Sequence, residues 1–348
     1  MLSRKLLALG AGAALAVTVT ACGSSPGSTT NTQGQPVVTI MVGGLDKQIY
    51  LPAMLAQQLG LYQQQGLEVH LEDEPAGVNA ENDMIAGKID GVVGFYDHNI
   101  DLQGKGKATE AVVQMLQVPG EVELCRSDVA GQIKSPADWK GRSLGVTDIG
   151  SSTDFLTRFL AVRNGVPVDQ IHESGVQAGN TFIAAMQHKN IDCGMTTEPT
   201  VSALINTGQA KILLDMRTAD GARAALGGVY PASSLYMSTD YVTKHADIVQ
   251  KLANAYVGTM HWISTHTPEE IADKMPADYY KGVGKAAYVA ALKSEKGIYT
   301  TDGLMPGDGP QTVLNVLSAF NPDVKGHTID LAKTYTNDFA VKANQALK

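Results

Sequence analysis

The sequence predicts an α/β protein of two lobes, each a mainly parallel sheet flanked by helices, joined by a two-strand hinge. The chain has 348 residues, which is too long for one typical domain and suits two. Strand-type apolar runs alternate with segments of helical spacing through residues 37–216. The same order of elements also occurs twice, so we expect two lobes with one plan.

Three pairs of segments carry the internal repeat. The first pair is LAQQLGLY, from Leu55, and LAVRNGVP, from Leu160. The second is MIAGKIDGVVGF (84–95) with MQHKNIDCGMTT (186–197), and the third is LQGKGKATEAVVQML (102–116) with INTGQAKILLDM (205–216). Each half therefore reads strand, polar turn, helix, strand, helix, strand, polar turn, helix, strand.

The expected elements follow from this pattern and from what comes after it. The first half gives strands at 37–42, 68–71, 91–95 and 111–116, with helices from 50 and near 78–86. The second half gives strands at 142–147, 171–176, 192–196 and 211–216, with helices from 152 and near 180–189. Beyond residue 216 we expect a strand at 235–237, a long helix over 240–264, and helices separated by Pro and Gly from 268 to 348.

The strand-like segments near 118–123 and 230–236 are expected to cross between the lobes as the hinge. Lobe I would then consist of residues 37–118 and 235–348, and lobe II of residues 119–234.

The N-terminus has the pattern of an export signal over residues 1–21. Arg4 and Lys5 precede an apolar run at 6–21, which is shorter than the roughly 20 residues that a membrane span needs. The run ends in VTAC, which resembles a bacterial lipobox and implies a lipidated Cys22 and an exported, membrane-anchored lipoprotein. Residues 22–36 are rich in Gly, Ser and Thr, which is typical of a flexible tether. An ordinary secretory signal with a chance Cys is the alternative.

Charge and cysteine content restrict the function classes. Asp and Glu number 35 against 27 Lys and Arg, and no Lys/Arg run follows residue 5, which argues against a nucleic-acid partner. Cys125 and Cys193 lie in strand-like runs of an exported chain. They form either a disulfide or two buried thiols.

Polar loops follow the expected strands, and ligands of open parallel sheets bind at the carboxyl ends of strands. The turn GSST precedes an expected helix at 152, where Ser151 or Ser152 would serve either as a helix cap or as a ligand contact. Because this turn falls at the expected cleft, opposite GGLDK of the other half, we favour ligand contact. The candidate ligand-binding residues are Gly43, Gly44, Asp46, Tyr50, Tyr96, Asp97, His98, Ser151, Ser152, Thr153 and Glu198.

Four stretches resemble ABC-importer substrate-binding proteins of the nitrate/taurine/sulfonate and thiamine-pyrimidine-precursor binding family. They are IYLPAMLAQQLGLYQQQGLEVHL (49–71), IAGKIDGVVGF (85–95), IKSPADWKGRSLGVTDIGSSTDFLTRFLAVRNGV (133–166) and IDCGMTTEPTVSALINTG (191–208). The resemblance covers residues 37–265. It implies a type II periplasmic-binding-protein fold that closes on its ligand, a monomer, and delivery to a membrane permease with a separate ATPase. It also places ligand contacts in the loops named above.

The loop residues favour one ligand class. An oxyanion site is helped by an Arg, and none lies in these loops, where Lys47 is the nearest cation. Asp46, Asp97 and Glu198 with neighbouring aromatic residues suit a nitrogen-containing ring with N–H donors, such as a pyrimidine. A sulfonate, nitrate or aromatic carboxylate is the second choice.

The sequence argues against two other kinds of protein, an enzyme and a metal-binding protein. A pyrimidine-precursor synthase-like enzyme of this fold would need a cysteine-rich iron motif, and Cys125 and Cys193 stand alone. A metal-binding protein would need grouped ligands, but His261 and His266 are five positions apart and lie off one helix face. We therefore expect a binding protein without catalysis, metal or cofactor. A receptor-signalling role remains open.

Overall fold

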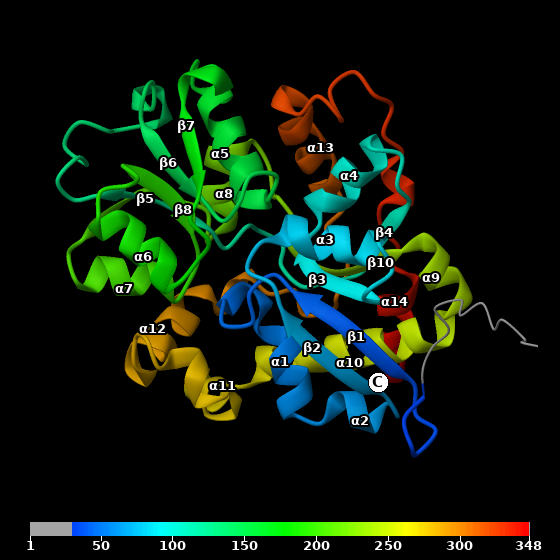
Figure 1. Cartoon of the computed structure of the whole chain (residues 1–348). Coiled ribbons are helices and arrows are strands. Elements are labelled where there is room, and N and C mark those ends of the chain that lie inside the picture. The colour runs from blue at the N-terminus through cyan, green and yellow to red at the C-terminus, as the bar shows by residue number, and fades with distance from the viewer. Residues whose placement is uncertain (1–29, 348) are drawn as a thin grey trace, which may run out of the picture.

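The computed structural model describes residues 30–347 and shows two lobes, each built on a five-stranded sheet (Figure 1). The predicted signal peptide 1–21 and Cys22 lie outside the described residues. Residues 30–36 belong to the predicted tether but form a turn, in which the Asn31 side chain accepts hydrogen bonds from the backbone N–H of Gln33 and Gln35. Asn31 also donates to Glu68 at 2.7 Å, so this part of the segment is fastened to the first sheet.

The first sheet has the strand order β2-β1-β3-β10-β4. Strands β1, β2 and β3 are parallel, and β10 runs antiparallel to both β3 and β4. The sheet is therefore mainly parallel, as predicted, with one reversed strand. Its strands are β1 (Val37–Val42), β2 (Glu68–Asp73), β3 (Gly91–Phe95), β4 (Thr109–Gln114) and β10 (Ser233–Ser238).

The second sheet repeats this plan with the order β7-β6-β8-β5-β9. Strand β6 is parallel to β7 and β8, and β5 is the reversed strand between β8 and β9. The weak sequence repeat thus corresponds to a shared topology. Its strands are β5 (Val122–Arg126), β6 (Ser143–Val146), β7 (His172–Gly175), β8 (Cys193–Thr196) and β9 (Ala210–Asp215).

The reversed strand of each sheet follows a crossing between the lobes. The chain crosses from β4 to β5 through residues 115–121 and returns from β9 to β10 through residues 216–232 (Figure 1). The two crossings touch, because the Met216 N–H donates to the Glu121 carbonyl at 2.9 Å. Strand β10 of the first sheet begins at Ser233. The first lobe therefore resumes two residues earlier than the predicted boundary between residues 234 and 235.

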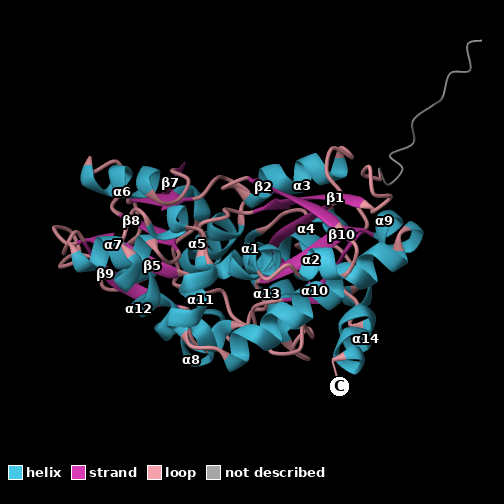
Figure 2. Cartoon of the chain, turned by 90° about the horizontal axis from the view of Figure 1, so that it is seen from below, coloured by secondary structure: helices cyan, strands magenta, loops and turns pink. Residues whose placement is uncertain are grey.

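Helices cover both sheets (Figure 2). The predicted helices from residues 50 and 152 appear as α1 and α5, but the predicted long helix 240–264 is two helices, because the backbone breaks at His245 (φ −125°, ψ 36°). Helices α1 to α7 are Leu51–Gln58, Leu61–Gln64, Gly77–Ile85, Asp97–Gly104, Ser152–Arg163, Asn180–Gln187 and Thr200–Asn206. Helices α8 to α14 are Ala219–Leu226, Thr239–Lys244, Ala246–Thr265, Pro268–Lys274, Lys285–Glu295, Gly309–Phe320 and Asp338–Ala346.

The core of the second lobe shows how side-chain alternation orients β5. Val122 and Leu124 pack with Phe182 of α6 and Leu204 of α7 on one face of the sheet. Residues two apart on a strand share a face, so Glu121, Glu123 and Cys125 belong to the opposite one. There Cys125 is joined to Cys193 of β8 by a disulfide, the alternative that the sequence left open.

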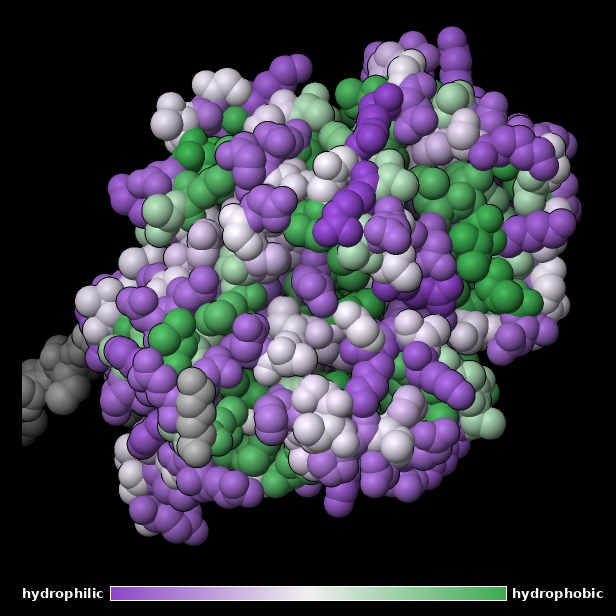
Figure 3. Space-filling view, turned by 180° about the vertical axis from the view of Figure 1, so that it is seen from behind, coloured by the Kyte–Doolittle hydropathy of each residue, from purple (hydrophilic) through white to green (hydrophobic). Residues whose placement is uncertain are grey.

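The face shown in Figure 3 is mostly polar, and apolar residues gather on it in separate patches. Within residues 30–347, none of the helices combines the length and the apolar character that a membrane crossing requires.

Candidate functional site

A small cavity of about 20 Å³ lies between the two lobes, at the carboxyl ends of β1, β3 and β6. Both lobes line it, as expected for a cleft at strand ends. Of the predicted residues, six line the cavity: Gly43, Tyr50, His98, Ser151, Ser152 and Thr153. The remaining lining residues are Lys47, Ile49, Pro75, Gly77, Phe95, Glu121 and Thr147.

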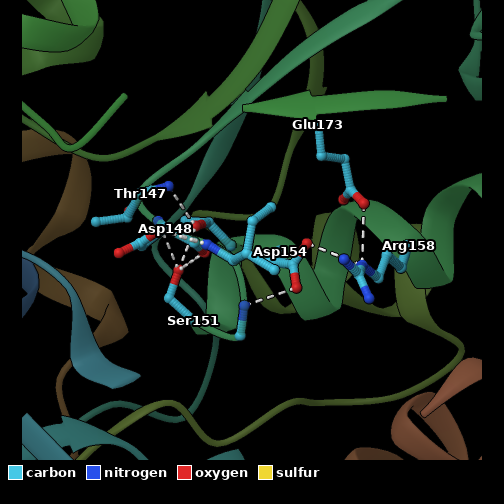
Figure 4. Close-up of polar contacts among 9 residues, drawn as sticks. Thr147, Asp148, Ser151, Asp154, Arg158 and Glu173 are labelled. Carbon is cyan, nitrogen blue, oxygen red and sulfur yellow. Dashed lines mark hydrogen bonds and ion pairs between the residues drawn. The ribbon is translucent and has the colours of Figure 1, made fainter. Parts of the chain in front are cut away.

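The turn before α5 is held by its own side chains (Figure 4). Ser151 is the residue before the helix, but its hydroxyl makes no cap bond to the helix; it accepts from the Asp148 N–H and donates to the Asp148 carbonyl. Thr153 Oγ1 accepts from the Thr147 N–H at 2.8 Å. The first N–H groups of the helix therefore keep the partial positive charge of a helix N-terminus at the cavity wall.

An acid network fixes the direction of α5. Asp154 accepts from the Gly150 N–H at 2.9 Å and pairs with Arg158 at 2.9 Å. Arg158 also pairs with Glu173 of β7, and it lies between the two carboxylates in Figure 4. Because this network ties the turn to the helix and to the neighbouring strand, the wall formed by Ser151 to Thr153 is preorganised.

Ser152 makes a hydrogen bond across the cleft. Its hydroxyl donates to Asp97 Oδ1 of α4 at 2.8 Å, and the Tyr230 hydroxyl donates to the other Asp97 oxygen at 2.7 Å. Burial raises the pKa of Asp97, while His98 and these two hydroxyl donors act to lower it. Asp97 was predicted to contact ligand; it lies behind the cavity wall and links the lobes through the hinge residue Tyr230.

His98 lies in the cavity wall and is paired from behind. Its Nδ1 is 2.8 Å from Glu81 Oε2 of α3, and both side chains are at least 98% buried. Burial lowers the pKa of His98, but the Glu81 carboxylate outweighs it, and the pKa is raised to about 9. The imidazole is thus protonated at neutral pH and brings a positive charge to the cavity. A Cβ on Gly77 would lie 2.7 Å from His98 Nε2, so only glycine leaves room for this ring.

A second cation, Lys47, comes from the loop after β1. Its Nζ donates to the carbonyls of Gly43 at 2.7 Å and Pro75 at 2.9 Å, which leaves one of its three N–H groups for another partner. Gly44 (φ +114°) permits the turn that brings Lys47 back, since a Cβ there would lie 2.7 Å from the Lys47 side chain. Gly44 therefore shapes the cavity from behind.

Glu121 places a carboxyl group in the cavity from the hinge. Burial raises its pKa to about 8, although Lys47 acts to lower it, and its Oε2 has no hydrogen-bond partner among residues 30–347. The sequence reasoning missed this residue. The two acids in the strand-like run EVELCRS, at the crossing between lobes, were the signal that could have found it.

Three further predicted residues do not line the cavity. Tyr96 is fully buried, and its hydroxyl bonds to Thr334. Glu198 is 1% exposed and pairs with Arg217 at 2.8 Å, so its charge is compensated within the protein. Asp46 lines a separate, wider hollow between the lobes, next to Asn180 of α6. These three side chains are directed elsewhere although their loops are at the cleft.

Comparison with known proteins gives a family match and many similar folds. The model of the NMT1/THI5-like family matches residues 49–271. A solved protein from Bordetella bronchiseptica RB50 is 33% identical, with a TM-score of 0.86 over 89% of this chain and 98% of that one. None of the curated proteins matches the chain.

Two more distant structures share the fold. The alkanesulfonate-binding protein SsuA from Xanthomonas axonopodis pv. citri, bound to MOPS, has a TM-score of 0.69 at 16% identity, over 86% of this chain and 98% of that one. The periplasmic nitrate-binding protein NrtA from Synechocystis PCC 6803 has a TM-score of 0.68 at 16% identity, over 90% of this chain and 89% of that one. The two lobes described above thus form the type II fold of periplasmic binding proteins. With a family match that spans more than half of its length, the chain belongs to the NMT1/THI5-like family.

Proposed function

We propose that this protein is the extracytoplasmic solute-binding component of an ABC importer. It captures a small organic molecule between its lobes and delivers it to a membrane permease that a separate ATPase drives. The observation that carries the proposal is the cavity lined from both lobes, by Tyr50 and His98 on one side and Ser151 to Thr153 on the other. The two distant structures support it, since they bind an alkanesulfonate and nitrate.

The mechanism follows from the contacts at the cleft. A ligand first meets the groups of one lobe, and closure adds the hydroxyls and N–H groups of α5. Closure also removes water, so each polar contact strengthens in the lower dielectric. The hydrogen bond from Ser152 to Asp97 joins the two lobes in the closed state. It therefore stabilises that state in addition to the contacts that the ligand makes. The ligand shifts the equilibrium only by its preference for the closed state.

A nitrogen-containing ring, such as a pyrimidine, is the ligand class that we propose. Tyr50 and Phe95 meet edge to face at 6.5 Å in the cavity wall and offer an aromatic surface to a ring. The Glu121 carboxyl offers polar atoms to ring nitrogens.

A small anion is the second candidate, and two observations favour it. Lys47 and the protonated His98 bring positive charge to the cavity. The N-terminus of α5, a helix of 12 residues, lies in the same wall. A sulfonate, nitrate or aromatic carboxylate would use these groups, and no Arg side chain is needed.

We also propose that the protein is exported, lipidated at Cys22 and monomeric. Labelling cells with a radioactive or clickable fatty acid tests the anchor directly. The wild-type protein should carry the label and sediment with membranes, whereas Cys22→Ser should carry none and be released. Label on both proteins would contradict the assignment of Cys22.

A thermal-shift screen tests the function. We would use the mature chain with Cys22→Ser against pyrimidines, flavins, aromatic acids, sulfonates, nitrate and divalent metals. A ligand at about 100 times its Kd stabilises the fold by about 2.7 kcal/mol, which is a measurable rise in melting temperature. Stabilisation by one organic or anionic class would support the proposal and name the cargo.

Two outcomes would refute it, one in this screen and one in a separate activity assay. Stabilisation by metals alone would favour a metal-binding protein, although no three His, Cys, Asp or Glu side chains of residues 30–347 are grouped to hold a metal. Turnover of a pyrimidine precursor would favour a synthase-like enzyme, although Cys125 and Cys193 are joined to each other.

A further inference from the structure

One buried carboxyl group in the cavity has an oxygen without a hydrogen-bond partner in residues 30–347. Glu121 is 3% exposed, lines the cavity, and leaves Oε2 without a hydrogen bond among the described residues. An unpaired buried polar atom costs about 1–3 kcal/mol, so the fold alone gives no reason to keep it. A ligand that donates a hydrogen bond would remove this cost.

The backbone of Glu121 is held where the two lobes join. Its carbonyl accepts from the Met216 N–H at 2.9 Å, and the preceding Gly120 N–H donates to the Met216 carbonyl at 3.3 Å. Both hinge crossings therefore meet at this residue. A ligand bound to the Glu121 side chain would contact the hinge itself as well as the lobes.

We propose that Glu121 is the specificity-determining residue of the cavity, and that its unpaired oxygen accepts a hydrogen bond from an N–H group of the ligand. The inference rests on the proposed binding function and deepens it. The required chemistry is an amino group, whether it is carried by a heterocycle or by an aliphatic anion. Lys47, with one N–H group left, would donate to an acceptor on the same ligand.

Glu123 provides a matched control. It lies two residues further along the chain, is fully buried, and has both carboxyl oxygens unpartnered within residues 30–347. Unlike Glu121, it does not line the cavity. Both residues are buried and have an unpartnered carboxyl oxygen within residues 30–347, but Glu121 lines the cavity and Glu123 does not.

The experiment measures binding of two pairs of compounds that differ in one amino group. The pairs are 4-aminopyrimidine with pyrimidine and taurine with ethanesulfonate, titrated by calorimetry into the full mature chain with Cys22→Ser. The same titrations are repeated with the variants Glu121→Leu, Glu121→Gln and Glu123→Leu, each made in this Cys22→Ser protein. Melting curves without ligand check folding; Glu121→Leu and Glu123→Leu should both melt at or above the wild-type temperature, because each removes an unpaired buried carboxyl.

We expect the wild type to bind the amino member of one pair at least about tenfold more tightly, which is typical of a ligand hydrogen bond to a buried group. Glu121→Leu should reduce this preference to less than about threefold, while Glu123→Leu keeps it. Glu121→Gln retains an acceptor oxygen and should keep part of the preference. The pair that shows the effect identifies whether a ring or an aliphatic anion carries the amino group.

Two results would overturn the inference and leave the binding function standing. One is binding of nitrate or ethanesulfonate with no gain from an amino group. The other is a preference that survives in Glu121→Leu. If no compound in this set or in the wider screen binds the wild type, the proposed function fails, and the inference fails with it.

Discussion

The buried pair of His98 and Glu81 predicts a loss of stability as the pH rises through the alkaline range. The pKa of His98 is raised from 6.5 to about 9 in the folded protein. A group with a raised folded pKa contributes its full stabilisation below the unfolded pKa and loses it as the pH rises through the folded one. His98 therefore stabilises the fold fully below about pH 6.5, and the contribution is lost by about pH 9.

The size of this loss of stability follows from the rise in the pKa of His98. A rise from 6.5 to about 9 corresponds to about 3 kcal/mol of unfolding free energy. Glu121 and Glu173 each have a pKa raised to about 8, so their contributions also fall with rising pH. The effect of His98 must therefore be isolated by comparing the wild type with His98→Gln.

The assay is urea unfolding followed by circular dichroism at constant ionic strength, between about pH 6 and pH 9.5. The stability advantage of the wild type over His98→Gln should shrink by about 3 kcal/mol across this range. Glu81→Gln removes the partner that raises the pKa, and its stability should depend on pH less steeply than that of the wild type. An advantage that stays constant to within about 1 kcal/mol would refute the reasoning.

Three further predictions concern single contacts. Ser152→Ala removes the hydroxyl that donates to the buried Asp97 across the cleft, so it should weaken lobe closure by about 1–3 kcal/mol. The variant should then show a larger radius of gyration in small-angle scattering, and an unchanged scattering curve would contradict this. Gly77→Ala places a methyl group against His98 Nε2, so it should lower the unfolding free energy by about 1–3 kcal/mol and weaken ligand binding. Gly131→Ala is the matched control, because Gly131 also lacks a positive φ but has open space beside it. Replacing Cys125 and Cys193 by Ser opens a loop of 68 residues and should cost about 4 kcal/mol in urea unfolding; equal midpoints with and without the bond would contradict this.

The architecture was largely predictable because it depends on regular patterns. Alternation and helical spacing located the strands from Val37 to Asp215, and the repeat predicted a second sheet on the same plan. The break at His245 was missed, since the apolar spacing continues through it and a single backbone angle ends α9. Reversal of β5 and β10 was also missed, because strand direction depends on the path of the chain between lobes.

The site was predictable only at the level of loops. Six predicted residues line the cavity, since strand ends determine where loops meet. Asp97 accepts a hydrogen bond from Tyr230, and Glu198 pairs with Arg217. Both partners are distant in the chain, and no local pattern reveals them. Lys47 and Glu121 line the same cavity only after the hinge is folded. Spacing within one segment therefore predicts which loops form the cleft but not which side chains enter it.

The reversed strands also determine the order in which the sheets can assemble during synthesis. Strand β4 pairs with β10 and with no other strand in the described sheet, so the first sheet stays incomplete until residues 233–238 have been made. All strands of the second sheet lie between Val122 and Asp215, an uninterrupted stretch of chain. The lobe that is encoded second can thus complete its sheet before the lobe that is encoded first. An N-terminal fragment ending at residue 118 would expose the edges of β3 and β4, which makes it a substrate for chaperones rather than an independent domain.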